Sequence, residues 1–174
     1  MKNILIIFFL LGAVTLSSCD KEYGTFYSDN RPVVPVTFPG ATTYGFNPYI
    51  THSIASGGDI TFTMSIPENS GRTIREITKV VGGATAINAG SVNSAVVGGT
   101  GSTAAYNTAV IPGNGTTATF TTNLTEFAAK TGEAAKTDAN KLIKSGGELA
   151  FMFLVTLDNG ETIIPVQVRV RLVQ

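Results

Sequence analysis

The stretch ELAFMFLVTLDNGETIIPVQVRVRLV, residues 148–173, decides the fold class of this 174-residue chain. Asn159-Gly160 separates two apolar runs, and Asn-Gly in this position is typical of a tight hairpin turn with positive φ at both central residues. A two-residue loop would pair Asp158 with Glu161 and fix every partner beyond them. One face of the hairpin then collects only apolar side chains, namely Leu149, Phe151, Phe153, Val155, Ile164, Val166, Val168 and Val170.

The two strands of this hairpin differ in their outward positions. The first run also carries Met152 and Leu154, so it is apolar on both faces and we expect it to be central in a sheet. The second run has polar outward positions and Pro165, which favour a place nearer an edge. The pair resembles the last two strands of an immunoglobulin-like sandwich.

Two further strands are predicted upstream of the hairpin. Residues Asp59–Ile66 alternate apolar and polar side chains with a period of two, which a helix cannot produce, and Pro67 ends the run. Residues Arg72–Val81 continue as a second strand. Its apolar phase slips between Ile74 and Ile77, which predicts a β-bulge.

A stretch without any charged side chain extends over residues 80–125. Within it, Asn107–Ile111 and Thr116–Thr122 are predicted to be short strands. Asn123 then has the features of a helix N-cap, and Gly132 is positioned to end that helix. The many hydroxyl and amide groups of the stretch suit hydrogen bonding to glycans; the alternative is a set of polar surface loops.

Together these elements predict an all-β protein. The expected architecture is an immunoglobulin-like antiparallel β-sandwich of about seven strands, with a short helical crossover before the C-terminal hairpin. A small barrel is the alternative. With 43% hydrophobic and 14% charged residues, the chain is too apolar for intrinsic disorder. The chain has no Trp and one Cys, so any immunoglobulin resemblance is architectural.

The N-terminal sequence MKNILIIFFLLGAVTLSSC predicts export. Lys2 precedes an apolar run, Ile4–Leu16, that is too short for a bilayer span of ~20 residues. Leu16-Ser17-Ser18-Cys19 resembles a bacterial lipobox, which implies that Cys19 is lipidated. We therefore expect a signal peptide over 1–18, a lipidated Cys and tether over 19–32, and a β-sandwich domain over 33–174. The alternative is an ordinary cleavage site beside an incidental Cys.

The residues after Cys19 bear on the membrane address. Asp20-Lys21-Glu22 is similar to the short acidic cluster that follows the Cys in surface-exported lipoproteins of Bacteroidota type. The resemblance implies a protein anchored by lipid in the outer membrane and facing the cell surface. In lipoproteins of the enteric type, Asp after the Cys is instead an inner-membrane retention signal, and a plain polar linker is the third alternative.

Composition excludes several function classes. The net charge is zero, so no basic field exists to hold nucleic acid. One Cys and one His, His52, exclude multi-cysteine and paired-histidine zinc motifs, and we expect no cofactor. His52 is most simply a strand end, and the GxGxxA match at residues 99–104 most simply a loop. The acids are scattered beside turns, so the sequence does not predict an enzyme.

The candidate ligand-binding residues are Tyr44, Phe46 and Tyr49, which cluster in the segment TTYGFNPYI. Exposed aromatic rings stack on sugars or anchor protein partners; the alternative is that they plug one end of the sandwich. We expect a lipid-anchored envelope protein with a non-catalytic role in binding, or in assembly with an outer-membrane protein complex. The alternative function is that of a carbohydrate-binding accessory lipoprotein of a glycan-uptake system.

Overall fold

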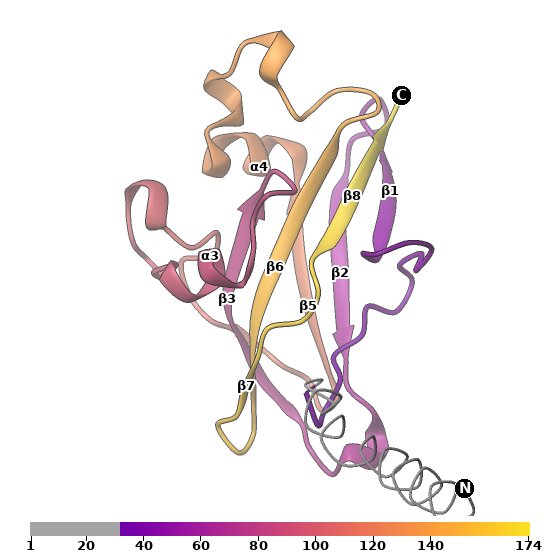
Figure 1. Ribbon diagram of the computed structural model, residues 1–174, viewed down its shortest axis with the longest axis vertical. Helices are drawn as coiled ribbons and strands as arrows, with labels where there is room; N and C mark the ends of the chain where they lie inside the picture. Colours follow the sequence, from indigo (N-terminus) through magenta and orange to yellow (C-terminus); the bar gives the residue numbers. More distant parts are fainter. Residues whose placement is uncertain (1–31) are drawn as a thin grey trace, which may run out of the picture. The chain divides into compact units, whose positions relative to one another are not determined.

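The structure is a computed structural model, and it describes residues 32–174 (Figure 1). Residues Val33–Gln174 form one compact unit. The signal peptide expected over 1–18, the lipidation expected at Cys19 and nearly all of the tether lie outside the described residues. The hydrophobic core is built from side chains of the unit itself, so we expect this unit to fold alone.

The described residues are mostly β and contain two short α-helices (Figure 1). Short 3-10 turns occupy Glu68–Ser70, Gly101–Thr103, Glu133–Ala135 and Asp138–Asn140. The helices and strands are β1 (Tyr49–Ser53), β2 (Asp59–Ser65), β3 (Ile74–Gly83), α3 (Ala89–Ser94), β4 (Ile111–Pro112), β5 (Thr117–Asn123), α4 (Leu124–Thr131), β6 (Glu148–Leu157), β7 (Thr162–Ile163) and β8 (Val168–Val173).

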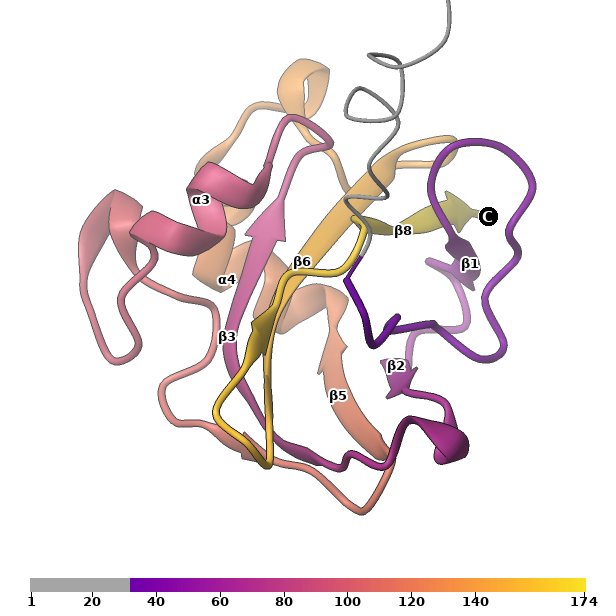
Figure 2. The same cartoon turned by 60° about the horizontal axis from the view of Figure 1, so that its bottom comes forward.

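The strands are divided between two sheets. The larger has the order β1-β8-β6-β3-β4, with β7 paired to β6, and the smaller consists of β2 and β5. β1 runs parallel to β8, whereas the other pairs are antiparallel, so the larger sheet is mixed. Figure 2 shows how this sheet curls around β2 and β5. The central place predicted for the first hairpin strand, β6, is confirmed.

Aromatic side chains fill the space between the two sheets. Phe62 of β2 lies with its ring centroid 5.4 Å from that of Phe151 on β6. Phe120 of β5 lies 5.6 Å from both Phe151 and Phe153. Phe127 of α4 closes the core and is completely buried. The alternation predicted for Asp59–Ile66 is confirmed, because every second side chain of β2 points into this core.

The turn of the C-terminal hairpin differs from the prediction. The N–H of Gly160 donates to the carbonyl of Leu157 at 3.0 Å, and the N–H of Leu157 donates to the carbonyl of Glu161 at 2.9 Å. The loop therefore has three residues, and only Gly160 has positive φ, at 84°. The prediction of positive φ at Asn159 is therefore wrong. The physical reason is that a type I turn followed by a left-handed glycine is also compatible with the twist of the two strands, and it needs positive φ only at the glycine.

The pairing register of the hairpin changes once along its length. Near the turn Val155 pairs with Ile163, one residue away from the prediction, whereas Phe151 pairs with Val168 as predicted. The returning strand thus carries one extra residue, in a segment where Pro165 has no N–H to donate. Val166 is 58% exposed, so its predicted place on the inner face is wrong. The predicted burial is confirmed for Leu149, Phe151, Phe153, Val155, Val168 and Val170.

The strand predicted over Asn107–Ile111 is wrong except at its last residue. Asn107 is buried, and its side chain takes the place of a neighbouring strand. Its Oδ1 accepts from the N–H of Val80 at 2.7 Å, and its Nδ2 donates to the carbonyls of Thr78 and Ala109 at 3.1 and 2.8 Å. One side chain thereby satisfies the edge groups of Thr78 and Val80 on β3, and the backbone of the 107 segment has no need to extend there.

Three other local predictions from the sequence are confirmed. β3 shows register shifts between Ile74 and Glu76 and after Ile77, as the slipped phase predicted. The strand predicted over Thr116–Thr122 is β5, one residue displaced. α4 begins where the Asn123 side chain accepts from a backbone N–H, and ends at Gly132 with φ 76°.

The face of β6 that points away from the core is also covered. Met152 is only 7% exposed there, because α3 packs over β3 and β6 with Val92 and Ala95 buried beneath it. Gln167 holds this covering segment down, since its Nε2 donates to the carbonyl of Ile87 at 2.9 Å. In the described part of the chain, neither α-helix has the length and apolarity required to cross a bilayer.

Candidate functional site

The aromatic loop, residues 43–48, presents two of the three predicted binding residues to solvent. Backbone hydrogen bonds between Thr42 and Tyr49, of 2.7 and 2.9 Å, close its base. Tyr44 is 86% exposed and Phe46 is 100% exposed, and Gly45 between them has φ 90°. The positive φ of Gly45 forms the turn that carries both rings away from the sheet.

The base of the aromatic loop is fixed to the larger sheet. Arg169 of β8 donates its N–H to the carbonyl of Pro48 at 2.9 Å, and its Nη2 lies 3.1 Å from Asn47 once that side-chain amide is oriented to satisfy its neighbours. The Arg171 guanidinium lies over the Tyr49 ring, 3.6 Å from its centroid. One ring face of Tyr49 is therefore covered, and Tyr49 supports the loop while Tyr44 and Phe46 form its tip.

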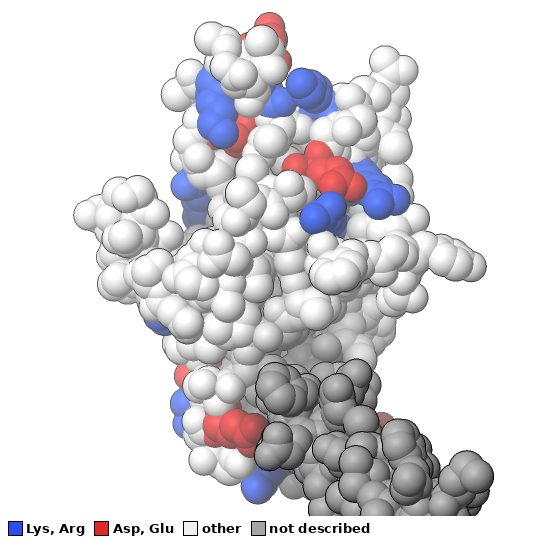
Figure 3. All heavy atoms as spheres, viewed as in Figure 1, with Lys and Arg blue, Asp and Glu red and all other residues white. Residues whose placement is uncertain are grey.

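Two arginines behind the aromatic loop share one carboxylate. Glu148 of β6 accepts from Arg169 at 2.9 Å through Oε2 and from Arg171 at 2.8 Å through Oε1. Figure 3 shows charged atoms gathered toward the two ends of this face, with a wide uncharged region between them. A partner that approaches this face meets uncharged side chains over its middle.

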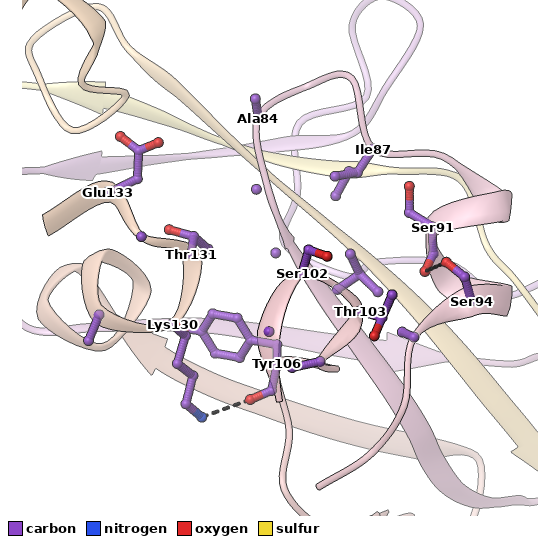
Figure 4. A pocket seen from close by; sticks show the side chains of 18 of the residues that line it. Ala84, Ile87, Ser91, Ser94, Ser102, Thr103, Tyr106, Lys130, Thr131 and Glu133 are labelled. Carbon is purple, nitrogen blue, oxygen red and sulfur yellow. Dashed lines mark hydrogen bonds between the residues drawn. The ribbon is translucent and has the colours of Figure 1, made fainter. Parts of the chain in front are cut away.

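A second feature is a cleft of about 700 Å³ beside the end of β3, with a mixed polar and apolar lining; we name it the polar cleft after its hydroxyl-bearing side chains. Its walls come from Gly82 and Gly83, from the turn Gly101–Thr103 and from α4 with the residues that follow it (Figure 4). Most of the lining belongs to the charge-free stretch. The two lysines that reach the cleft are both paired, Lys130 with Glu126 at 2.7 Å and Lys136 with Glu133.

The floor of the polar cleft is held by a network around Tyr106. Its hydroxyl lies 2.5 Å from Thr122 Oγ1, which donates to Glu126 Oε2 at 2.9 Å. Burial raises the pKa of the Tyr106 phenol far above its ordinary value, and the hydrogen bond from Lys130 lowers the pKa of Glu126. The phenol therefore stays protonated and the carboxylate charged. This network fixes the floor and does not supply an acid or base near neutral pH.

Other candidates considered from the sequence do not form a reactive cluster. His52 lies on β1 opposite Leu172, and its buried Nε2 has no hydrogen-bond partner among residues 32–174. Gly101–Thr103 forms a 3-10 turn, whereas a dinucleotide site requires a helix to open at this motif. Within the described residues, no group of three or more His, Cys, Asp or Glu side chains is placed to hold a metal ion.

Sequence reasoning did not predict the polar cleft. Its lining combines residues from within three segments, 81–95, 101–106 and 129–136, which no spacing rule connects. The signals available in the sequence are the charge-free stretch and the pair Gly82-Gly83 that follows the predicted strand Arg72–Val81. Comparisons with protein-family models, with curated proteins and with solved structures found no match to the chain.

Proposed function

We propose that this protein is anchored in the bacterial outer membrane by a lipid on Cys19, faces the cell surface, and binds a partner without catalysis through the aromatic loop. The observation that carries the proposal is the exposure of Tyr44 and Phe46 on a loop whose base is fixed. Such aromatic rings gain from burial only when a second molecule covers them.

The rigid base of the aromatic loop favours binding. A flexible loop loses conformational entropy when it binds a partner, and this loss weakens affinity. Hydrogen bonds among Thr42, Tyr49, Pro48 and Arg169 already fix the backbone at the base of the aromatic loop in the free protein, so less entropy is lost on binding. Tyr and Phe side chains add few rotatable bonds of their own. The loop therefore offers a large contact area at low entropic cost, which is typical of residues that dominate binding interfaces.

We propose further that the domain is an immunoglobulin-like β-sandwich. The strand order supports this. β3, β6 and β8 lie side by side in the same order as strands C, F and G of an immunoglobulin domain, and β2 pairs with β5 as strand B pairs with strand E. β4 then takes the place of an additional strand beside C. In sandwiches of this kind the sheets form a rigid scaffold, and exposed loops carry the binding function.

The second candidate function is that of an accessory glycan-binding lipoprotein. The observation that favours it is the absence of Asp, Glu, Lys and Arg from Thr42 to Ser53, so the segment that carries the two exposed rings has no charged side chain of its own. Neutral sugars stack their apolar ring faces on such aromatic rings and use hydroxyl groups around them. A protein partner would use the same rings as anchors in a pocket of its own.

Retention on a panel of polysaccharides separates the two candidates. The probe is the chain 20–174, compared with Tyr44→Ala/Phe46→Ala and with Val110→Ala, which removes an exposed apolar side chain elsewhere. Retention that is lost only in the double variant, with an unchanged melting temperature, favours the glycan binder. If no polysaccharide retains the protein, the proposal requires a protein partner. Cross-linking in the envelope must then yield an adduct with the wild-type protein that the double variant does not form. Adducts that are equal in both proteins would contradict binding through the aromatic loop.

The anchor is tested separately from binding. In a Bacteroidota host fed with a clickable fatty acid, we expect the protein to carry the label and the Cys19→Ser variant to lose it. Ser18→Ala keeps a small residue before the Cys and is expected to retain the label. A labelled Cys19→Ser variant would place the lipid elsewhere, and an unlabelled wild type would contradict the anchor.

A further inference from the structure

We propose that the polar cleft binds a neutral saccharide that carries an N-acetyl group, with the amide of that group paired to the backbone of Gly82. This site goes beyond the proposed function and is separate from the aromatic loop. The loop precedes β1 at one edge of the larger sheet, and the cleft lies beside β3 toward the other edge.

The first step of the argument is the direction of the Gly82 backbone. The register between β3 and β6 is regular from Lys79 to Gly83. Val80 directs its N–H to Asn107 Oδ1 at 2.7 Å and its carbonyl to the N–H of Tyr106 at 2.7 Å, so both groups point away from β6. In an antiparallel pair this direction alternates from residue to residue, so the N–H and carbonyl of Gly82 also point away from β6.

The second step is that these two groups remain without a partner. β4 pairs only with Glu76 and Ile77, and Asn107 and Tyr106 serve Val80. Among the described residues, no hydrogen bond outside the sheet ladders involves Gly82. Gly82 lines the cleft, so this donor and this acceptor are the groups that its backbone can offer to a ligand there. Backbone groups in this state are a ready-made template for an amide, which offers the complementary acceptor and donor.

The remaining lining narrows the class of ligand. Ser102 and Thr103 line the middle of the cleft, and their hydroxyls make no hydrogen bond to another described side chain or backbone group (Figure 4). Ala84 and Ile87 provide an apolar wall for a methyl group. The paired lysines leave no uncompensated charge. An acetamido sugar matches these features, because it combines one amide, one methyl group and several hydroxyls without a net charge.

The cleft also constrains the choice of variant. A Cβ at Gly82 would lie 2.9 Å from Tyr106 Cδ2 and 3.0 Å from Phe151 Cε1, so replacing this glycine would perturb the core and say little about binding. The double variant Ser102→Ala/Thr103→Val removes two exposed hydroxyls and leaves the backbone unchanged. Thr108→Val, an exposed threonine outside the cleft, is the matched control.

The test is a titration of the ¹⁵N-labelled chain 20–174 with N,N′-diacetylchitobiose, followed by amide resonances. We expect saturable shifts at Gly82, Gly83 and Ser102, and affinity about ten-fold weaker in the double variant, because two neutral hydrogen bonds are lost. Thr108→Val should bind as the wild type does. Cellobiose has the same linkage with a hydroxyl in place of each acetamido group, and we expect it to leave Gly82 unshifted.

Three results would overturn the proposal. The first is the absence of shifts at these amides at millimolar sugar, and the second is an equal response to cellobiose, which would remove the role of the amide. In the third, N-acetylalanine methylamide binds the cleft and the sugar does not, so the site takes a peptide. None of these results depends on Tyr44 or Phe46, so failure here leaves the aromatic loop unaffected.

Discussion

Asn107 offers the sharpest test of how the larger sheet is completed without a full strand beside β3. Its side chain is 5% exposed and makes three hydrogen bonds, all to backbone groups. Asn107→Ala leaves the N–H of Val80 and the carbonyl of Thr78 without their partner. At ~1–3 kcal/mol for each buried polar group left unpaired, and with some water entry, we expect the free energy of unfolding to fall by about 2–4 kcal/mol.

The assay is urea unfolding of the chain 20–174 followed by far-ultraviolet circular dichroism, because the chain has no Trp to report by fluorescence. With a denaturant slope of ~1–3 kcal/mol per molar urea, the midpoint should fall by roughly 1–2 M. Asn140→Ala removes an exposed side chain of the same type, and we expect it to change stability by less than ~0.5 kcal/mol.

A second variant separates hydrogen bonding from packing. Asn107→Asp conserves the shape of the side chain and can still accept from Val80. It loses the two donors to Thr78 and Ala109 and places a carboxylate against their carbonyls, so we expect at least the loss seen with alanine. If the aspartate variant is as stable as the wild type, or the alanine variant differs from it by less than ~0.5 kcal/mol, the strand-substituting role of Asn107 is refuted.

Three further outcomes are expected. Lys130 lowers the pKa of Glu126, so this ion pair stabilises the folded protein above the carboxyl pKa of the unfolded chain. The stabilisation is lost as the pH falls through the carboxyl pKa of the folded protein. The free energy of unfolding, measured against pH, should therefore fall less in acid for Lys130→Met than for the wild type, and an identical profile would contradict the pairing. Gly160→Ala forces a Cβ into φ 84° and should lower stability by about 1 kcal/mol in urea unfolding, whereas an unchanged midpoint would argue against the three-residue turn. If the protein is displayed at the surface, trypsin added to intact cells should release it by cleavage after Lys21, because Pro32 protects the bond after Arg31. Complete protection would contradict display or an accessible tether.

The fold could be predicted from the sequence where apolar and polar residues alternate along a strand that packs against the core over its whole length. Phe151 and Phe153 were placed correctly because alternation over a long strand leaves one choice of buried face. Asn159-Gly160 was ambiguous, since two-residue and three-residue loops both favour glycine at their last position, which is residue 160 in either case. Pro165 then interrupts the hydrogen-bonded ladder between β6 and the returning strand. The alternation of apolar and polar residues does not reveal that the returning strand has one extra residue there.

Side chains that replace backbone were invisible to pattern reasoning. In the sequence, Asn107 looks like the start of a polar strand. In the structure its side-chain amide forms the hydrogen bonds to β3 that a neighbouring strand would otherwise form, and no local pattern in the sequence reveals that Asn107 lies beside β3. The candidate site shows the same division. Tyr44 and Phe46 could be nominated from composition alone, whereas the support given to Tyr49 by Arg171 needed the pairing of β1 with β8.

The parallel pairing of β1 with β8 has a mechanical consequence. Tyr49 lies beside Arg169 and Ser53 beside Val173, so the start of the first strand and the end of the last one are at opposite ends of the ladder. Tension applied between Tyr49 and Val173 would load the rungs in shear, and they would have to break together. A pull perpendicular to the strands would open them one at a time, so the domain should resist force along one axis far better than along the other.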